Sequence, residues 1–372
     1  MRPRSAPERY ASMNRLAIRS LQLILPVLLL SVSTFAAPTY RIESISGLGG
    51  NYARARAVNC DGRVVGEAYT INNVEHGFMY FGDVSSDLGT LGGLRSRMFD
   101  VNASGYAVGW AQDVTGVSRP AFWDGRQMLG LQTLGGPSGS AWAINDAGIV
   151  VGNSYISQSV YHATCWIGGL PHDLGTLGGQ YSIAYDINSL GWIVGSAYNS
   201  SNHECATLWM GGSPVTNLGG LPGSTWSTAR GVNDVGQVIL WSDTFAGASH
   251  AALWDDNSVM DLGTLGGDDS WAYGLNNLGC VVGWAELRAG NYHAFVYDGT
   301  GMTDLGTLGG MFSSAYGIND DGVIVGAAQN SYGQWEAVRW VPVPEPCGFS
   351  IVLTCLAGTA AAFYTQRKRR TV

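Results

Sequence analysis

Histidine recurs at one fixed place in this 372-residue chain, four residues before an aromatic residue, and a repeated imidazole is a candidate for metal binding or acid–base chemistry. The members are His76, His162, His250 and His293. The equivalent places elsewhere hold Arg119, Cys205 and Glu336. A shared zinc ion needs its nitrogen ligands about 2.0–2.1 Å away, which one residue per structural unit cannot supply. We therefore expect these histidines to hydrogen-bond the adjacent loops, and we predict no metal site.

Two pairs of adjacent carboxylates are the next candidates, Asp268-Asp269 and Asp320-Asp321. Paired carboxylates can hydrolyse glycosides, but neighbours on a turn usually point apart and stay solvated. The sequence contains no Gly-x-Ser-x-Gly elbow, no Gly-x-x-x-x-Gly-Lys phosphate loop and no HExxH helix. We expect no catalytic residue and no cofactor. A secreted carbohydrate-active hydrolase that uses these carboxylates is the alternative.

Asparagine also recurs, always three residues before a glycine. The asparagines are Asn59, Asn102, Asn145, Asn188, Asn233, Asn276 and Asn319. This spacing is typical of a turn in which the Asn side chain caps the backbone and the Gly takes a positive φ. A calcium loop is the alternative at 319–322, but calcium needs six or more oxygen ligands and residues 102–105 contain no carboxylate. We expect turns.

These residues belong to a unit of 43 or 44 residues that occurs seven times. The units begin at Leu48, Leu91, Leu134, Leu177, Leu221, Leu265 and Leu308. Each predicts four short strands rich in β-branched and aromatic residues; in one unit they are residues 140–145, 149–152, 162–166 and 172–175. Apolar residues on both faces of the strands indicate sheets that stack on each other. Four-stranded units of this length are typical of β-propeller blades.

The two ends of the repeat decide between a closed ring and an open solenoid. The seventh unit stops at Trp340 without a fourth strand, whereas an unpaired strand sequence at 41–45 precedes the first unit. An open array would leave that strand as an exposed edge, but a ring would use it. We predict an all-β, seven-bladed β-propeller of four-stranded blades over residues 37–341, closed by an N-terminal strand that completes the last blade.

The loop between the second and third strands is the best candidate for binding. Its length is constant and its sequence varies, with aromatic residues among Asn, Gln and Ser. The candidates are Tyr69, Tyr155, Tyr198, Tyr292, Tyr332 and Trp335. Exposed aromatic rings beside amides suit sugar rings or a protein surface. Simple packing of these rings over the rim is the alternative.

Both ends of the chain have the features of segments that direct export and are removed by processing. Arginines precede an apolar run at 21–32 and small residues at 36–37, which predicts a signal peptide over 1–36 and therefore export. At the other end, a Pro-rich segment at 342–346 precedes residues 347–372, in which an uncharged stretch at 347–364 is followed by basic residues. That stretch is long enough to cross a bilayer, with a basic stop after it.

Charge excludes one class of partner. Residues 37–346 contain 11 Arg, no Lys and 27 Asp plus Glu, a formal balance of −16. Binding to a phosphate backbone requires clustered Lys and Arg. We therefore expect no nucleic-acid partner, and we expect membrane contact only through the C-terminal segment before processing.

Two sequence patterns resemble known families. Asp-Leu-Gly-Thr-Leu-Gly-Gly at 87–93, 173–179, 261–267 and 304–310, with His-Ala-Phe at 293–295, resembles the extracellular HAF-repeat family, a resemblance that implies no established enzymatic activity. The tail resembles a PEP-CTERM sorting signal. The residues that carry this second resemblance are Pro344, Glu345, Pro346, Arg367, Lys368, Arg369 and Arg370. It implies transient anchoring in the inner membrane, recognition by an exosortase, and release or attachment at the cell surface; a plain C-terminal anchor is the alternative.

Together these features predict an exported, non-catalytic surface or matrix protein. We expect it to bind exopolysaccharide or another surface protein through its propeller loops. A purely structural surface protein is a further alternative to the hydrolase named above.

Overall fold

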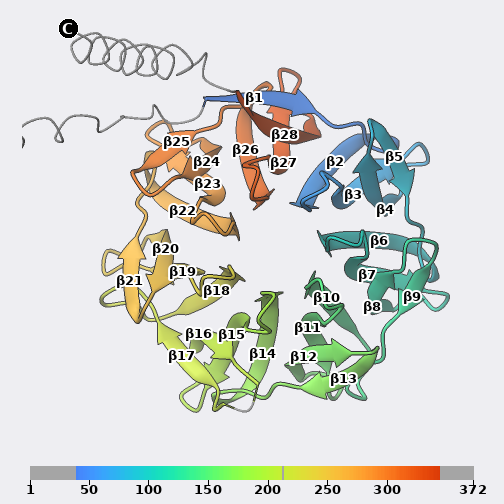
Figure 1. Ribbon diagram of the computed structural model, residues 1–372, viewed down its shortest axis with the longest axis vertical. Coiled ribbons are helices and arrows are strands. Elements are labelled where there is room, and N and C mark those ends of the chain that lie inside the picture. The colour runs from blue at the N-terminus through green and yellow to red at the C-terminus, as the bar shows by residue number, and fades with distance from the viewer. Residues whose placement is uncertain (1–38, 212, 344–372) are drawn as a thin grey trace, which may run out of the picture. The chain divides into compact units, whose positions relative to one another are not determined.

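The computed structural model describes residues 39–211 and 213–343. The predicted signal peptide and the predicted sorting signal, from Pro344 to the basic residues at 367–370, lie outside this part of the chain. Within it the strands form seven four-stranded antiparallel sheets, arranged as the blades of a ring (Figure 1). This confirms the predicted seven-bladed propeller. No helix among the described residues is long and apolar enough to span a membrane.

The two inner strands of each blade follow the repeat in chain order. The innermost strands are β2 (Gly49–Val58), β6 (Gly92–Val101), β10 (Gly139–Ile144), β14 (Gly178–Ile187), β18 (Ser227–Val232), β22 (Gly266–Leu275) and β26 (Gly309–Ile318). The second strands are β3 (Val64–Thr70), β7 (Ala107–Asp113), β11 (Val150–Tyr155), β15 (Ile193–Asn199), β19 (Val238–Asp243), β23 (Val281–Leu287) and β27 (Ile324–Asn330). We number the blades 1 to 7 in this order.

The two outer strands complete each blade. The third strands are β4 (Glu75–Phe81), β8 (Ser118–Trp123), β12 (Tyr161–Ile167), β16 (Glu204–Trp209), β20 (Ser249–Asp255), β24 (Tyr292–Tyr297) and β28 (Trp335–Val343). The outermost strands are β5 (Val84–Asp87), β9 (Met128–Gly130), β13 (Leu170–Asp173), β17 (Thr216–Gly219), β21 (Ser258–Asp261), β25 (Met302–Asp304) and, in blade 7, β1 (Thr39–Ser44).

The N-terminal strand closes the ring as predicted. β1 pairs antiparallel with β28, from Thr39 opposite Val343 to Ser44 opposite Val338. The Arg339 guanidinium donates to Glu43 at 2.7 Å, which adds an ion pair to this junction. The observed β28 extends past Trp340, so Pro342 and Val343, predicted to belong to the Pro-rich linker, are part of the sheet. Proline is tolerated there because only one side of the strand end has a partner.

The hydrophobic core lies between the blades. One cluster joins Val194 and Leu208 of blade 4 to Val238 and Leu240 of blade 5, and a second joins Val282 of blade 6 to residues of blade 7. These residues are buried because each sheet is covered on both faces, as the apolar pattern predicts. Each blade therefore depends on its neighbours for stability.

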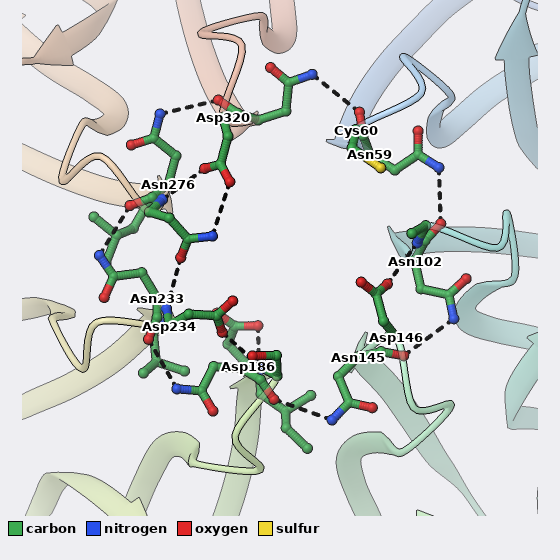
Figure 2. A pocket seen from close by; sticks show the side chains of 18 of the residues that line it. Asn59, Cys60, Asn102, Asn145, Asp146, Asp186, Asn233, Asp234, Asn276 and Asp320 are labelled. Atoms are coloured by element: carbon green, nitrogen blue, oxygen red, sulfur yellow. Dashed lines mark hydrogen bonds between the residues drawn. The ribbon is translucent and has the colours of Figure 1, made fainter.

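The asparagine turns have two functions, of which the sequence predicts one. The Asn59 Oδ1 accepts hydrogen bonds from the N–H groups of Asp61 and Arg63, and Gly62 has a φ of 80°. The second function is a bond to the next blade, since each Asn Nδ2 donates to the backbone carbonyl of the next Asn at 2.9–3.2 Å. Asn319 donates to Asn59, so this asparagine ring is closed (Figure 2).

The propeller therefore has two distinct faces. The asparagine ring lies on one of them, which we call the asparagine face. Because adjacent strands in a blade run in opposite directions, the loops from the second to the third strand lie on the other face. The connections between blades, such as 88–91, lie there too. We call this the loop face.

Candidate functional site

The six aromatic residues predicted to bind a ligand are all on the loop face but do not form one patch. They belong to blades 1, 3, 4, 6 and 7, at the ends of second strands, at the starts of third strands or in the loop between them. Tyr332 is 87% exposed. The other five are half-buried: Tyr69, Tyr155, Tyr198, Tyr292 and Trp335.

Neighbouring aromatic residues explain this burial for four of the five. Tyr155 and Tyr198 are joined through Tyr161 and Tyr181, with successive ring centroids 5.5, 5.0 and 5.6 Å apart. Aromatic pairs at such distances contribute to stability beyond the area they bury. The structure therefore brings Tyr155 and Tyr198 into one cluster.

Two other predicted residues have separate aromatic partners. The Tyr69 ring lies 4.9 Å from Tyr52. The Tyr292 ring lies 4.8 Å from Trp284 and 4.7 Å from Phe312. These two rings therefore pack against neighbouring rings and remain partly exposed.

The predicted histidine bonds to the adjacent loops are present. His76 Nδ1 lies 2.8 Å from an Asp87 oxygen, and its Nε2 lies 3.1 Å from the carbonyl oxygen of Leu94 in the next blade. The other three histidines bond to the equivalent aspartates, Asp173, Asp261 and Asp304. Each pair joins a third strand to the last residue of the outermost strand in the same blade.

Blade 7 breaks this pattern at its junction with blade 1. Its residue at the histidine place is Glu336, which accepts hydrogen bonds from Ser44 and, at 2.7 Å, from the Asn330 amide. A cavity of about 450 Å³ lies at this junction. We call it the seam groove, and its lining includes Asn51, Tyr52, Gln334, Trp335 and Glu336.

The equivalent groove between blades 1 and 2 has different chemistry. Its volume is about 490 Å³, and its lining includes Ile71, Val74 and Leu94 beside the His76–Asp87 pair. The seam groove instead presents two aromatic rings with amides and a carboxylate. Burial raises the pKa of Tyr52 to about 12.

A second cavity lies on the axis of the ring. Seven innermost-strand residues, one from each blade, form what we call the axial ring: Arg56, Phe99, Trp142, Tyr185, Arg230, Tyr273 and Tyr316. Several neighbours in this ring are in contact; the Phe99 and Trp142 rings stack at 4.3 Å, and the Arg230 guanidinium lies 3.7 Å from the Tyr185 ring centre. The cavity that they line has a volume of about 200 Å³.

Two aspartates face this axial cavity. Asp100 accepts the N–H groups of Val101 and Ile144, each at 2.8 Å, and therefore links blades 2 and 3. Asp186 makes the equivalent bonds and links blades 4 and 5. Burial raises the pKa of Asp100 to about 6. Burial, reinforced by the charge of Asp100, raises the pKa of Asp186 to about 7. Figure 2 shows Asp186 beside the asparagine ring.

The two carboxylate pairs lie on opposite faces. Asp269, near the start of β22 on the loop face, accepts the Ser249 N–H at 2.7 Å, while Asp268 is exposed. Asp320, on the asparagine face, accepts the N–H of Asn277 at 2.9 Å. No group of three or more His, Cys, Asp or Glu in the described part of the chain is placed to hold a metal ion.

Several residues of these two cavities are not predicted from the sequence. In the seam groove they are Asn51 and Tyr52, and on the axis they are Asp100, Asp186 and Arg230. For the two aspartates the signal is departure from the repeat, since they replace the alanine or glycine of the other blades. Tyr52 carries no such signal, because Tyr181 and Phe312 occupy the same place in blades 4 and 7.

No protein-family model and no curated protein matches this chain. Among solved structures, it is similar to a puromycin-hydrolysing peptidase of Mycobacterium tuberculosis, with a TM-score of 0.54 and 13% identity over 82% of this chain and 54% of the peptidase. The chain thus spans about half the length of that protein. It also aligns with YCF48 bound to D1 peptide, with a TM-score of 0.44 and 13% identity over 85% of this chain and 100% of the other. A six-bladed β-propeller lectin of Aleuria aurantia has a TM-score of 0.34 and 12% identity, over 84% of this chain and 98% of the lectin. At these identities the likeness concerns the fold alone.

Proposed function

We propose that this protein is an exported, non-catalytic binding propeller that takes a polysaccharide in the seam groove. The observation that carries the proposal is the groove lining, in which Tyr52 and Trp335 lie beside Asn51, Gln334 and Glu336. Aromatic rings with a few convergent polar groups are what a sugar-binding site needs, because the rings cover the apolar face of a sugar and the polar groups bond its hydroxyls.

The carboxylate of the groove supports binding rather than hydrolysis. Both Glu336 oxygens already accept hydrogen bonds, from Ser44 and Asn330, which fixes the carboxylate as an acceptor for a ligand hydroxyl. Glycoside hydrolysis needs two carboxyl groups about 5–9.5 Å apart across the scissile bond. Glu336 is the one carboxylate in the groove lining, so the hydrolase remains the weaker proposal.

A protein partner is the second candidate function. Three apolar side chains at the tips of loops on the loop face are almost fully exposed: Ile71 (83%), Val114 (81%) and Phe245 (92%). Exposed apolar groups of this kind favour contact with another surface protein. They lie in blades 1, 2 and 5, away from the seam groove.

Export to the cell surface is part of the proposal. It is supported by the predicted leader, by the acidic, lysine-free composition of residues 37–346, and by the resemblance of the tail to a sorting signal. An exosortase would then be the processing partner. A polysaccharide of the extracellular matrix is the ligand class that such a location supplies.

The binding proposal is tested with a groove variant and a matched control. Trp335→Ala should reduce binding of the purified protein to a polysaccharide that the wild type binds, by at least about tenfold, because one of the two aromatic rings that line the groove is lost. Phe245→Ala removes an exposed aromatic residue of the same face outside the groove and should have little effect. Binding is measured by co-sedimentation and confirmed by titration calorimetry. Equal binding by all three proteins would refute the groove as the site.

A further inference from the structure

We infer that the seam groove selects an acidic saccharide and that the Arg54 guanidinium binds the carboxylate of that ligand. The inference rests on the proposed function and gives it a substrate class. It comes from a comparison of two junctions between blades within the same molecule.

The junction between blades 1 and 2 provides the reference. There the first residue of the third strand, Glu75, forms an ion pair with Arg97 of the next innermost strand at 2.9 Å. Arg97 thus has an internal carboxylate partner. The two residues are at fixed repeat positions, 27 residues after Leu48 and six residues after Leu91.

At the junction between blades 7 and 1 the same two positions hold Trp335 and Arg54. Both junctions have an arginine, which the other five blades lack, but at this one an indole stands where the first has a carboxylate. The Arg54 guanidinium carbon lies 5.2 Å from the Trp335 ring centre and 5.4 Å from that of Tyr52. Among the described residues Arg54 forms no ion pair with a carboxylate. Its buried Nε has no hydrogen-bond partner, which is also true of the Arg97 Nε, so the difference between the two arginines is the carboxylate alone. Arg54 is therefore a half-buried cation without the counterion that its equivalent has.

A ligand carboxylate would restore the missing ion pair. A guanidinium binds a carboxylate through two parallel N–H donors, an arrangement roughly twice as strong as a neutral hydrogen bond. The two rings that flank Arg54 also line the groove, so a sugar in contact with them brings a ring substituent next to the guanidinium. Glu336, bonded to Ser44 and Asn330, belongs to the groove lining, whereas Arg54 lies against the Tyr52 and Trp335 rings next to that lining. A uronic acid with its carboxylate at Arg54 and its hydroxyls at Glu336 matches this arrangement.

The overall charge of the protein sets the conditions of the test. A balance of −16 over residues 37–346 repels a polyanion at long range. At 150 mM salt the screening length is about 8 Å, so this long-range repulsion is small. The contact with Arg54 then determines which saccharide binds more tightly. A short oligosaccharide is the suitable probe because it carries few charges beyond the groove.

The experiment uses the purified protein, a galacturonic acid trisaccharide and the same trisaccharide with its carboxyl groups reduced to alcohols. Calorimetric titration at 150 mM salt should show at least about tenfold tighter binding of the acid form by the wild type. Arg54→Gln should abolish this preference while the reduced sugar binds unchanged. Trp335→Glu, which recreates the Glu75–Arg97 pair, should also abolish it. Arg126→Gln changes the net charge equally at an exposed turn and should leave binding as in the wild type.

The outcomes separate this inference from the proposed function. Equal binding of the two sugars, or an unchanged preference in Arg54→Gln, would overturn the acidic ligand, while dependence of both sugars on Trp335 would still support the groove as a binding site. Independence from Trp335 would refute both. If either variant fails to fold by circular dichroism, the comparison of the two sugars on the wild type decides the question alone.

Discussion

Asp100 and Asp186 occupy a place that holds alanine or glycine in the other five blades: Ala57, Ala143, Gly231, Gly274 and Gly317. Each carboxylate links two blades by accepting two backbone N–H groups. The same position near the axis leaves them only partly exposed, which disfavours the ionised form. An aspartate in place of alanine or glycine therefore adds two hydrogen bonds, but its ionised form is destabilised by the loss of water.

These two carboxyl groups predict that stability falls as the pH rises from about 4 to about 7. Their folded-state pKa values, about 6 and about 7, lie above the value of about 3.9 for an unfolded aspartate. Between these limits the folded protein holds protons that the unfolded chain has released, so folding is favoured at the lower pH and the loss is complete above about pH 7. The thermal midpoint between pH 4.5 and 8 measures this slope.

The variant that checks the assignment is Asp100→Ala combined with Asp186→Ala, since alanine already occupies this place in blades 1 and 3. At pH 5 the variant should be less stable than the wild type because four N–H groups lose their acceptors. That deficit should narrow towards pH 8, where the wild type carries the cost of two buried charges. A deficit independent of pH would contradict the prediction.

The Asn59 side chain makes one bond that the sequence predicts and one that it does not. The Asn and Gly spacing identifies the turn that Asn59 caps, because the turn bonds are local. The bond from the same side chain to Asn102 joins residues 43 positions apart. No pattern within one unit contains it, since it exists only once the blades are placed around an axis. The Trp335–Arg54 contact was missed for the same reason.

At the scale of the strands, the repeat predicts which segments pair but not how the blades are fastened to one another. Four-stranded order, the position of the third strand and the closing strand all follow from length and alternation. The asparagine ring, the Nε2 bonds of His76 and His250 to carbonyls of the next blade, and the axial ring all act between blades. These contacts join the seven four-stranded sheets into one ring.

The asparagine ring predicts a specific difference between two similar substitutions. Asn145→Asp keeps the Oδ1 acceptor for the Ile149 N–H but replaces the Nδ2 donor to the Asn188 carbonyl by an oxygen. Two acceptors then face each other in a buried position, so we expect a loss of about 1–3 kcal/mol. Denaturant unfolding monitored by tryptophan fluorescence measures the change.

The control is Asn257→Asp in the exposed turn between β20 and β21, where Asn257 has a φ of 66°. This site makes no bond between blades, and a change within about 0.5 kcal/mol is expected. Similar losses at the two sites would show that turn propensity, rather than the contact between blades, explains the effect of Asn145→Asp.

At the scale of the whole molecule, the ring depends on a contact between the two ends of the described chain. Thr39 pairs with Val343 and Ser44 with Val338, and the asparagine ring closes with Asn319 bonded to Asn59, 260 residues apart. The same junction contains the seam groove, because 44–47 and 334–336 line it together. Closure of the fold and formation of the proposed binding site are therefore one event.

We predict that removal of the closing strand β1 lowers both the stability of the ring and saccharide binding, and that an added peptide restores both. Deletion of residues 39–45 leaves β28 as an edge with Val338 and Trp340 uncovered, which should lower the thermal midpoint and promote association. A synthetic peptide with the sequence of residues 37–46 should pair with that edge by strand addition and restore both the midpoint and saccharide binding. A peptide of scrambled order is the control. Restoration by the scrambled peptide, or a deletion variant as stable as the wild type, would show that the pairing of β1 with β28 does not hold the ring closed.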